Sequence, residues 1–226
     1  MKLLRQNREL KEVGAWNWTL PALGAKLDDG RTVLTCPNAG ACAALCYARN
    51  GTYLFPKVKA AHARNLKMVL DNLIGWTDEM TRECAKLKHG SYVRIHDSGD
   101  FFSEEYLRAW IQVARDVNGV TFYAYTKEVS MFKRIADTEA PANFRWLYSM
   151  GGKEDHLINI ETDRHAEVFP TAEALEAAGY FNQEASDILA IEAPTNRIGI
   201  VANRIPHFRK KQGVSTFGQL QRNKDV

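Results

Sequence analysis

The sequence predicts an α/β protein, and specifically a partial (β/α) barrel of about five or six parallel strands. Strand-like and helix-like segments alternate along most of the chain, which is typical of parallel strands joined by helical crossovers. The candidate strands end in polar or glycine-rich residues, as expected where loops gather at the carboxyl edge of a parallel sheet. With 226 residues, the chain is shorter than the about 250 residues of a complete eight-fold barrel. An open doubly wound sheet is the alternative.

Each element follows from its own residue pattern. Helices are predicted where apolar residues recur at helical spacing, as in 57–73, and strands where short apolar or β-branched runs lie between turn residues. In chain order, the sequence predicts a strand at 31–35, a helix at 57–73, a helix capped by Thr77 that runs through Cys84, a strand at 91–96, a helix capped by Ser103, a strand at 120–126, a helix at about 128–137, a strand at 144–150, a short apolar segment at 166–169, a helix at 171–179 and a strand at 198–203.

Composition is that of a soluble globular protein, at 45% hydrophobic and 25% charged residues. It excludes a disordered tail or a fibre. No repeat or linker divides the sequence, so we expect a single domain over 1–226 with a basic C-terminal extension at about 205–226. No window approaches the roughly 18 consecutive apolar residues that span a bilayer. We therefore expect a cytoplasmic protein without a membrane partner.

Three of the four cysteines, Cys36, Cys42 and Cys46, lie in one short loop at 35–53. In a reducing cytoplasm, clustered cysteines bind metal or do chemistry more often than they form disulfides. The C-x5-C-x3-C spacing has no second pair of cysteines, which favours an iron–sulfur cluster with one open iron over structural zinc. Zinc remains an alternative if Cys84, His62 or His96 supplies a fourth ligand, and thiols without metal are a third. Cys84, on a predicted helix, is expected to be an ordinary buried thiol.

Three segments carry a resemblance to known proteins. "CPNAGACAALCYA" (36–48), "RIHDSGDFFSEEYLRAW" (94–110) and "FYAYTK" (122–127) together resemble a family of bacteriophage-encoded proteins that is known only by a gene-product number. That family is in turn similar to the radical S-adenosylmethionine (radical SAM) enzymes. The superfamily pattern is C-x3-C-x-aromatic-C; here both gaps differ, and Leu45 stands where the aromatic residue would be, with Tyr47 on the other side of the last cysteine.

The resemblance implies a [4Fe-4S] cluster on the three cysteines of a loop at the C-terminal mouth of a partial barrel. It further implies that S-adenosyl-L-methionine chelates the open iron and is reductively cleaved to methionine and a 5′-deoxyadenosyl radical. An electron donor would then be a partner, and a phage-encoded chain would work in the cytoplasm of its host. The substrate and the catalytic residues are not implied.

The site residues expected to bind the cofactor lie at strand ends. The segment 98–100 resembles the glycine-rich segment that receives the methionine ammonium in the superfamily, with Gly99 allowing close backbone approach and Asp100 supplying an anion. Its alternative is a plain turn before the Ser103 cap. The full predicted set of cofactor-binding residues is Tyr47, Ser98, Gly99, Asp100, Lys127, Ser149 and Asn203.

A second function class stays open, namely a non-enzymatic phage protein stabilised by an iron–sulfur cluster or zinc that binds nucleic acid or a host protein. The net charge of +3 is too small to establish a nucleic-acid partner. The basic residues that such a surface would use are Lys57, Lys59, Arg64, Lys67, Arg209, Lys210 and Lys211.

Overall fold

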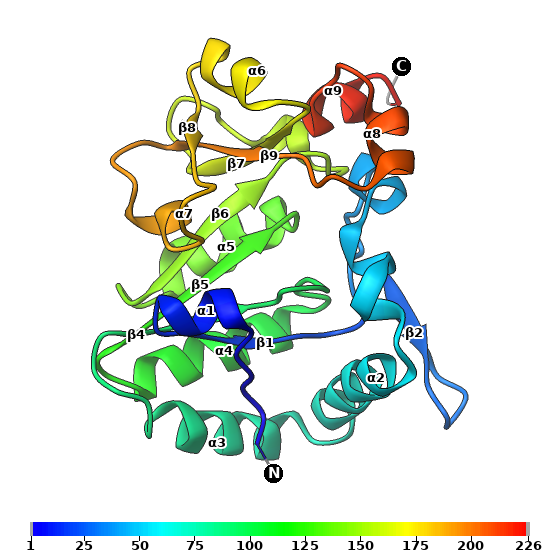
Figure 1. Ribbon diagram of the computed structural model, residues 1–226. Coiled ribbons are helices and arrows are strands. Elements are labelled where there is room, and N and C mark those ends of the chain that lie inside the picture. Colours follow the sequence, from blue (N-terminus) through cyan, green and yellow to red (C-terminus); the bar gives the residue numbers. More distant parts are fainter. Residues whose placement is uncertain (1, 225–226) are drawn as a thin grey trace. The chain divides into compact units, whose positions relative to one another are not determined.

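The α/β class is confirmed by a computed structural model, which describes residues 2–224 (Figure 1). Seven strands form a parallel sheet in the order β1-β4-β5-β6-β7-β9-β8, and β2 and β3 form a separate antiparallel pair. The described strands form no closed ring, and curvature into a partial barrel stays a prediction. The strands are β1 (Ala15–Trp18), β2 (Gly24–Lys26), β3 (Thr32–Leu34), β4 (Ser91–Ile95), β5 (Val120–Thr126), β6 (Phe144–Ser149), β7 (His165–Phe169), β8 (Phe181–Asn182) and β9 (Arg197–Val201).

Helices connect most of the strands. The α-helices are α1 (Arg8–Glu12), α2 (Pro56–Asp71), α3 (Leu73–Cys84), α4 (Glu104–Asp116), α5 (Val129–Glu139), α6 (Ala172–Ala177), α7 (Leu189–Glu192), α8 (Pro206–Gln212) and α9 (Phe217–Arg222). The short 3-10 helices are η1 (Ala41–Ala44), η2 (Tyr47–Arg49), η3 (Gly51–Leu54) and η4 (Asp155–Leu157). None of the helices among residues 2–224 has the length and apolar character needed to cross a membrane.

The chain divides into two compact units. Unit 1 contains the residues up to Pro37 together with Gly51–Ala124 and Ser130–Arg145, and unit 2 contains Asn38–Asn50, Tyr125–Val129 and the residues from Trp146 onward. Strands β5 and β6 therefore begin in unit 1 and end in unit 2. The single domain expected over 1–226 stays a prediction, and the last two residues of the expected basic extension lie outside the described residues.

Aromatic packing forms the centre of unit 1. The Trp76 ring of α3 lies 5.6 Å from the ring of Trp18, 5.4 Å from that of Tyr106 and 5.1 Å from that of Trp110. These rings join β1, α3 and α4, and burial of each aromatic side chain stabilises the unit through the area it removes from water. The Ser103 cap of α4 is confirmed, because its side chain accepts the Tyr106 backbone N–H.

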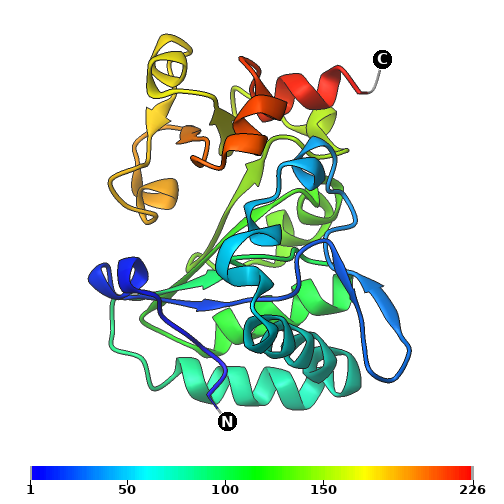
Figure 2. The same cartoon turned by 45° about the vertical axis from the view of Figure 1, so that its right-hand side comes forward.

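The β2–β3 hairpin belongs to unit 1 and lies beside α2 (Figure 2), and an exposed ion-pair network joins the two. Arg31, beyond the hairpin turn, pairs with Asp71 at the end of α2, and Lys67 of α2 reaches Asp29. Exposed pairs of this kind contribute little each, so the network fixes the hairpin's direction more than it stabilises the fold.

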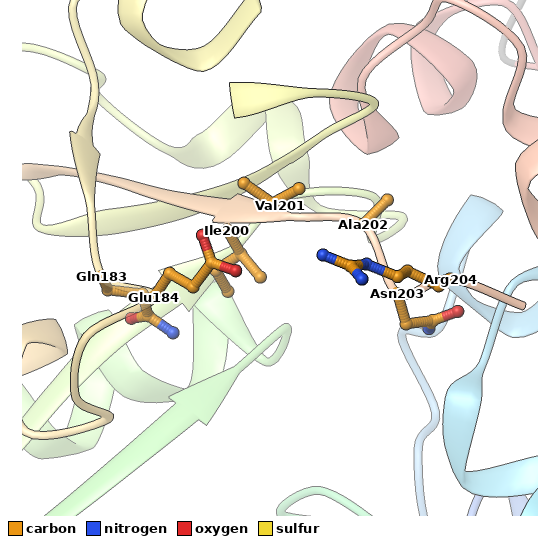
Figure 3. A pocket seen from close by; sticks show the side chains of 7 residues that line it. All are labelled: Gln183, Glu184, Ile200, Val201, Ala202, Asn203 and Arg204. Atoms are coloured by element: carbon orange, nitrogen blue, oxygen red, sulfur yellow. The ribbon is translucent and has the colours of Figure 1, made fainter. Parts of the chain in front are cut away.

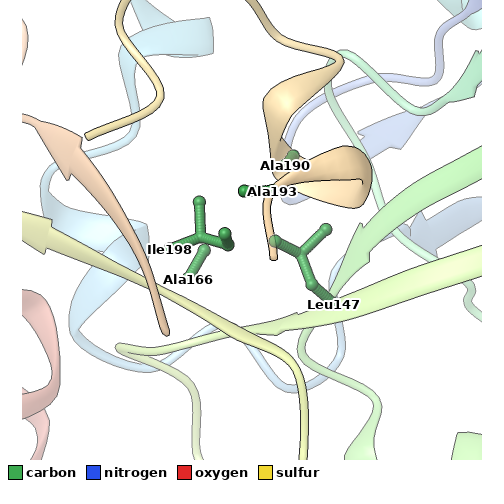
Figure 4. Close-up of a cluster of buried hydrophobic side chains, with 5 residues drawn as sticks. All are labelled: Leu147, Ala166, Ala190, Ala193 and Ile198. Carbon is green, nitrogen blue, oxygen red and sulfur yellow. The ribbon is translucent and has the colours of Figure 1, made fainter. Parts of the chain in front are cut away.

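A small apolar core organises unit 2. Leu147 of β6, Ala166 of β7 and Ile198 of β9 pack with Ala190 and Ala193 from the α7 region (Figure 4). The alanines permit close approach of the α7 segment to the sheet. This core fixes the strands whose carboxyl ends carry several predicted site residues.

Three details of the sequence prediction were wrong. The strand at 31–35 is β3 (Thr32–Leu34) and lies in the two-stranded hairpin rather than in the main sheet. Thr77 does not cap a helix, because Asn72 caps α3 and the Thr77 hydroxyl donates to Leu73 O inside it. Strands β1, β2 and β8 were not predicted at all, and the segment at 166–169 proves to be strand β7. All three missed strands are short.

Candidate functional site

The cysteine loop contains the three predicted metal ligands. Cys36, Cys42 and Cys46 are cysteines of intermediate exposure outside any disulfide, whereas Cys84 is buried. Burial raises the pKa of Cys84 to about 12, so this thiol is an inert part of the core. Cys36 belongs to unit 1 and the other two loop cysteines to unit 2.

Backbone contacts within unit 2 fix the part of the loop that carries Cys42. The Asn38 backbone N–H donates to Glu128 Oε1 (3.1 Å), and its side-chain Nδ2 donates to Oε2 of the same carboxylate (2.7 Å). The Asn38 carbonyl accepts from Lys153 N (2.9 Å), and Cys42 N donates to the Gly151 carbonyl (3.1 Å). The loop is therefore held from both strand ends, β5 through Glu128 and β6 through the Gly151–Lys153 segment.

Two glycines make this close docking possible. A Cβ on Gly152 would lie 3.0 Å from Lys127 Cβ and 3.1 Å from the Asn38 carbonyl oxygen. A Cβ on Gly40 would lie only 1.9 Å from Gln221 Oε1. A side chain at either position would push the cysteine loop away from its supports.

The C-terminal helix α9 supports the same loop. Gln221 Oε1 accepts the buried Ala41 N–H (2.6 Å), immediately before Cys42 in the chain. The start of α9 is in turn held by Glu167 of β7, whose carboxylate accepts Thr216 Oγ1 (2.9 Å) and Gly218 N (3.1 Å). Burial raises the pKa of Glu167, while these hydrogen bonds lower it. The C-terminal segment is thus a structural part of the site rather than only a basic extension.

One buried cation lies near the two thiols of unit 2. Lys127 is 9% exposed, and its Nζ donates to Ser149 O (3.0 Å) and Ser149 Oγ (2.6 Å). Burial raises the pKa of Cys46, the neighbouring Cys42 raises it further, and the cations of Lys127 and Arg49 lower it. The structure therefore brings together four of the residues predicted from the sequence: Cys42, Cys46, Lys127 and Ser149.

A partly buried carboxylate completes the surroundings of Lys127. Asp155 accepts the backbone N–H groups of Gly151 (2.7 Å) and Gly152 (2.8 Å). Burial raises its pKa, whereas these two N–H groups and the charges of Lys127 and Arg222 lower it. The Lys127 ammonium thus lies within electrostatic range of both a carboxylate and the thiols.

In unit 1, Asp100 lies beside the first predicted ligand. Its backbone N–H donates to the Thr35 carbonyl (2.7 Å), one residue before Cys36. Its carboxylate Oδ1 accepts the Phe101 N–H (2.8 Å), and the side chain is only 5% exposed. The contact between these two segments joins backbone atoms, and the predicted role of the Asp100 carboxylate stays a prediction.

Ser98 and Gly99 are packed against the end of β1. The Ser98 hydroxyl donates to the Leu20 carbonyl (2.6 Å), and Ser98 O accepts the Leu20 N–H (3.0 Å). Gly99 has φ +86°, and a Cβ there would lie 2.7 Å from Leu20 Cβ. These contacts give both residues a scaffold role that is sufficient to explain them, and their cofactor roles stay predictions.

Sequence reasoning missed a polar cluster after β4. The Tyr53 hydroxyl donates to Asp97 Oδ2, and Arg94 Nη1 lies 3.4 Å from Asp97 Oδ1. The ring of His62 lies 6.0 Å from that of Tyr53; burial lowers the His62 pKa, and Asp97 raises it. Arg94 lies on β4 and Asp97 follows the end of that strand, and these two positions were the available signals.

His96 belongs to the core of unit 1. Its Nε2 lies 2.9 Å from the Tyr106 hydroxyl, which also accepts from Trp18 Nε1 (2.9 Å). Burial lowers its pKa to about 3, so the imidazole is neutral at pH 7. Its backbone has φ +69°, and its buried Nδ1 has no hydrogen-bond partner among the described residues.

The last two predicted site residues are Tyr47 and Asn203. Tyr47 is 41% exposed at the start of η2. Asn203 lines a cavity of about 260 Å³ in unit 2. The Asn203 side-chain Oδ1 accepts the Ile205 N–H (3.3 Å), which fixes the turn after β9. The cavity is lined by Gln183, Glu184, Ile200, Val201, Ala202, Asn203 and Arg204 (Figure 3).

The supports of the cysteine loop were also missed. Glu128 directly follows Lys127 at the end of β5, so its position could have indicated a role. Gln221 and Glu167 lie far from the loop in sequence and carry no local signal, because only tertiary packing gives the helix α9 its place.

The donors fit a metal cluster in type and number, although no metal group is preassembled. Three partly accessible thiols are the soft ligands that iron–sulfur clusters and zinc use. Among residues 2–224, no group of three or more His, Cys, Asp or Glu side chains is arranged to hold a metal ion. Cys42 is close enough to Cys46 to raise the pKa of the Cys46 thiol. The three-thiolate site stays a prediction.

Comparison with known proteins identifies the family. The family model described as "Gene product 88" matches residues 1–225. The chain belongs to the gene product 88 family. It is 36% identical over 104 residues to the "Gene 88 protein" of Mycobacterium phage D29 and 34% identical over 102 residues to that of Mycobacterium phage L5.

Each of these alignments covers 41% of this chain, and 42% and 43% of the two relatives. The chain thus spans less than half the length of the curated relatives it matches. No solved structure matches this member of the family. The resemblance to a bacteriophage family is confirmed, and the further similarity to radical SAM enzymes stays a prediction.

Proposed function

We propose that the chain is an iron–sulfur protein in which Cys36, Cys42 and Cys46 hold a [4Fe-4S] cluster, and that it acts as a radical SAM-like enzyme on an unknown substrate. The observation that carries the proposal is the pair of thiols, Cys42 and Cys46, near the buried Lys127 cation. Both thiols lie on the cysteine loop, which is held by hydrogen bonds to Glu128 and Gln221. Burial raises the pKa of Cys46 overall, and the Lys127 cation opposes that rise and so favours the Cys46 thiolate, the form that binds metal.

The chain's own residues have separate roles in this proposal. The three thiolates bind the cluster, and the loop contacts to Glu128 and Gln221 hold Cys42 in place. Bound there, the cluster would supply the electron for reductive cleavage of S-adenosyl-L-methionine. An external electron donor would then return an electron to the cluster. The sheet would form a partial barrel in a protein that works in the host cytoplasm.

The predicted cofactor-binding residues complete the proposal. Asp100 would accept the methionine ammonium, because its carboxylate lies on the segment that contacts the chain next to Cys36. Lys127 and Ser149 would face the negative charge of the thiolates, with Lys127 oriented by its two hydrogen bonds to Ser149. The remaining predicted contacts come from Tyr47, Ser98, Gly99 and Asn203.

A second candidate is a metal-stabilised protein without catalytic activity that binds nucleic acid. The last turn of α8 favours it, because Arg209, Lys210 and Lys211 are exposed there and form no ion pair within the described part of the chain. Such a row of cations suits a phosphate backbone. In this candidate the thiols would hold zinc or a cluster for structural purposes only.

Anaerobic reconstitution distinguishes the two candidates. The purified chain is loaded with iron and sulfide, and its absorption and electron paramagnetic resonance spectra are recorded with and without S-adenosyl-L-methionine. The enzyme proposal predicts about four irons per chain, a reduced-state spectrum that changes when S-adenosyl-L-methionine is added, and 5′-deoxyadenosine as a product. A stable cluster with no spectral change, or preferential zinc binding, would contradict the enzyme proposal and favour the second candidate.

A further inference from the structure

The cavity of about 260 Å³ in unit 2 lies where two parallel strands end. Gln183 and Glu184 follow β8, and the segment from Ala202 to Arg204 follows β9, so the cavity is at the carboxyl ends of both strands. Loops at this edge of a parallel sheet are the usual place for small-molecule sites in α/β proteins. Its position depends on contacts within unit 2 alone.

Both ends of the cavity are held by hydrogen bonds. The Tyr125 hydroxyl lies 2.8 Å from Gln183 Oε1, and Gln183 N donates to the Gly199 carbonyl (3.2 Å). At the other end, the turn at Asn203 is closed by the Ile205 N–H (3.3 Å). The two loops are therefore ordered before any ligand binds, which lowers the entropy cost of binding.

Two opposite charges face each other across this cavity. Figure 3 shows the carboxylate of Glu184 and the guanidinium of Arg204 directed toward one another from the two strand ends. Neither group forms an ion pair with any side chain within residues 2–224. Between them, Ile200, Val201 and Ala202 give the cavity an apolar lining.

We propose that this cavity binds the head group of an α-amino acid, with the ammonium at Glu184 and the carboxylate at Arg204. A guanidinium can bind a carboxylate through two parallel hydrogen bonds, and the aliphatic side chain of the ligand would lie on the Ile200–Ala202 lining. A phosphate or another pure anion would be repelled by Glu184, and a pure cation by Arg204. A molecule with both charges satisfies both groups at once.

The volume limits the size of the ligand. About 260 Å³ accommodates a single amino acid but not a whole dinucleotide, since pockets for drug-sized ligands have about 300–1,000 Å³. The head group could come from a free amino acid or from the methionyl end of S-adenosyl-L-methionine. The site itself does not depend on the metal cluster proposed above.

Ligand-observed NMR with L-methionine and the purified full chain tests the proposal. A ligand of this size should bind with a Kd of about 1 mM. Glu184→Gln and Arg204→Gln should each weaken binding about tenfold, whereas Glu176→Gln and Lys211→Gln, which change exposed charges elsewhere in unit 2, should leave it unchanged. Because all four positions are exposed, the variants should fold, and circular dichroism checks this.

Single-charge analogues sharpen the test. 3-(Methylthio)propylamine, which lacks the carboxylate, should bind weakly and be sensitive only to Glu184→Gln; 4-(methylthio)butanoate, which lacks the ammonium, should be sensitive only to Arg204→Gln. Absence of L-methionine binding, or equal binding by the wild type and both cavity variants, would overturn the proposal. Displacement of L-methionine by S-adenosyl-L-methionine but not by adenosine would support the site and would assign the methionine ammonium of that molecule to Glu184 instead of Asp100. Absence of displacement would support the site with a free amino acid and leave the Asp100 assignment untouched.

Discussion

Replacing Gln221 with leucine should loosen the cysteine loop. Gln221 Oε1 accepts the Ala41 N–H at 2.6 Å, and the two residues are only 3% and 2% exposed. Leucine keeps most of the side-chain volume but removes the acceptor, so a buried N–H is left without its partner, at a cost of about 1–3 kcal/mol. If the loop opens more easily by this amount, the open population rises about 5- to 150-fold.

Thiol labelling measures that opening. Purified metal-free chain is treated with an alkylating reagent, and mass spectrometry follows each cysteine separately. Gln221→Leu should accelerate modification of Cys42 and Cys46 about 5- to 150-fold, while Cys84, which is 0% exposed, should remain slow.

Gln212→Leu is the matched control. Gln212 is buried to the same degree, at 4% exposed, and its Nε2 donates to the Val168 and Ser215 carbonyls rather than to the cysteine loop. It should destabilise the chain without accelerating labelling of Cys42 or Cys46. Equal labelling rates in the wild type and Gln221→Leu, or equal acceleration by both variants, would refute the idea that α9 holds the loop.

Three further predictions concern unit 1. Gly99→Ala should cost about 2–4 kcal/mol in urea unfolding, because it combines positive-φ strain with a close contact to Leu20, whereas Gly14→Ala, with open space around it, should cost about 1 kcal/mol; equal losses would contradict the steric argument. The protein should lose about 2 kcal/mol of its free energy of unfolding between pH 7 and pH 5, because the His96 pKa of 6.5 in the unfolded chain falls to about 3 when the ring is buried and only the unfolded state takes up a proton in that range. His96→Asn should flatten this part of the plot of unfolding free energy against pH, and an unchanged plot would contradict the prediction. Asp100→Asn should keep its iron and melting temperature but bind S-adenosyl-L-methionine about ten- to a hundred-fold more weakly by calorimetry; unchanged affinity would reject the assigned role.

The sequence predicted those parts of the fold that local patterns encode. Long amphipathic helices such as α4 and strands such as β5 show their period directly, and the Ser103 cap could be read from one residue and its neighbours. Strands β1 and β8 carry too few residues for a period, and β3 has a strand pattern that says nothing about which strand it pairs with.

The candidate site was predicted in the same uneven way. Cys42, Cys46, Lys127 and Ser149 were found because strand ends and clustered thiols have local signals, and they do lie together in unit 2. Gln221 was not found, since its contact with Ala41 joins residues 180 positions apart. Ser98 and Gly99 look like cofactor contacts in sequence, although their visible contacts are to Leu20.

Iron content of reconstituted single-cysteine variants tests the central claim most directly. Cys36→Ala, Cys42→Ala, Cys46→Ala and Cys84→Ala are each reconstituted anaerobically, and iron and sulfide are measured per chain. The account predicts that iron falls to background in each of the first three variants and stays at the wild-type value in Cys84→Ala, whose thiol is buried in the core of unit 1. Wild-type iron content in any of the three loop variants, or loss of iron in Cys84→Ala equal to theirs, would contradict a site built from Cys36, Cys42 and Cys46.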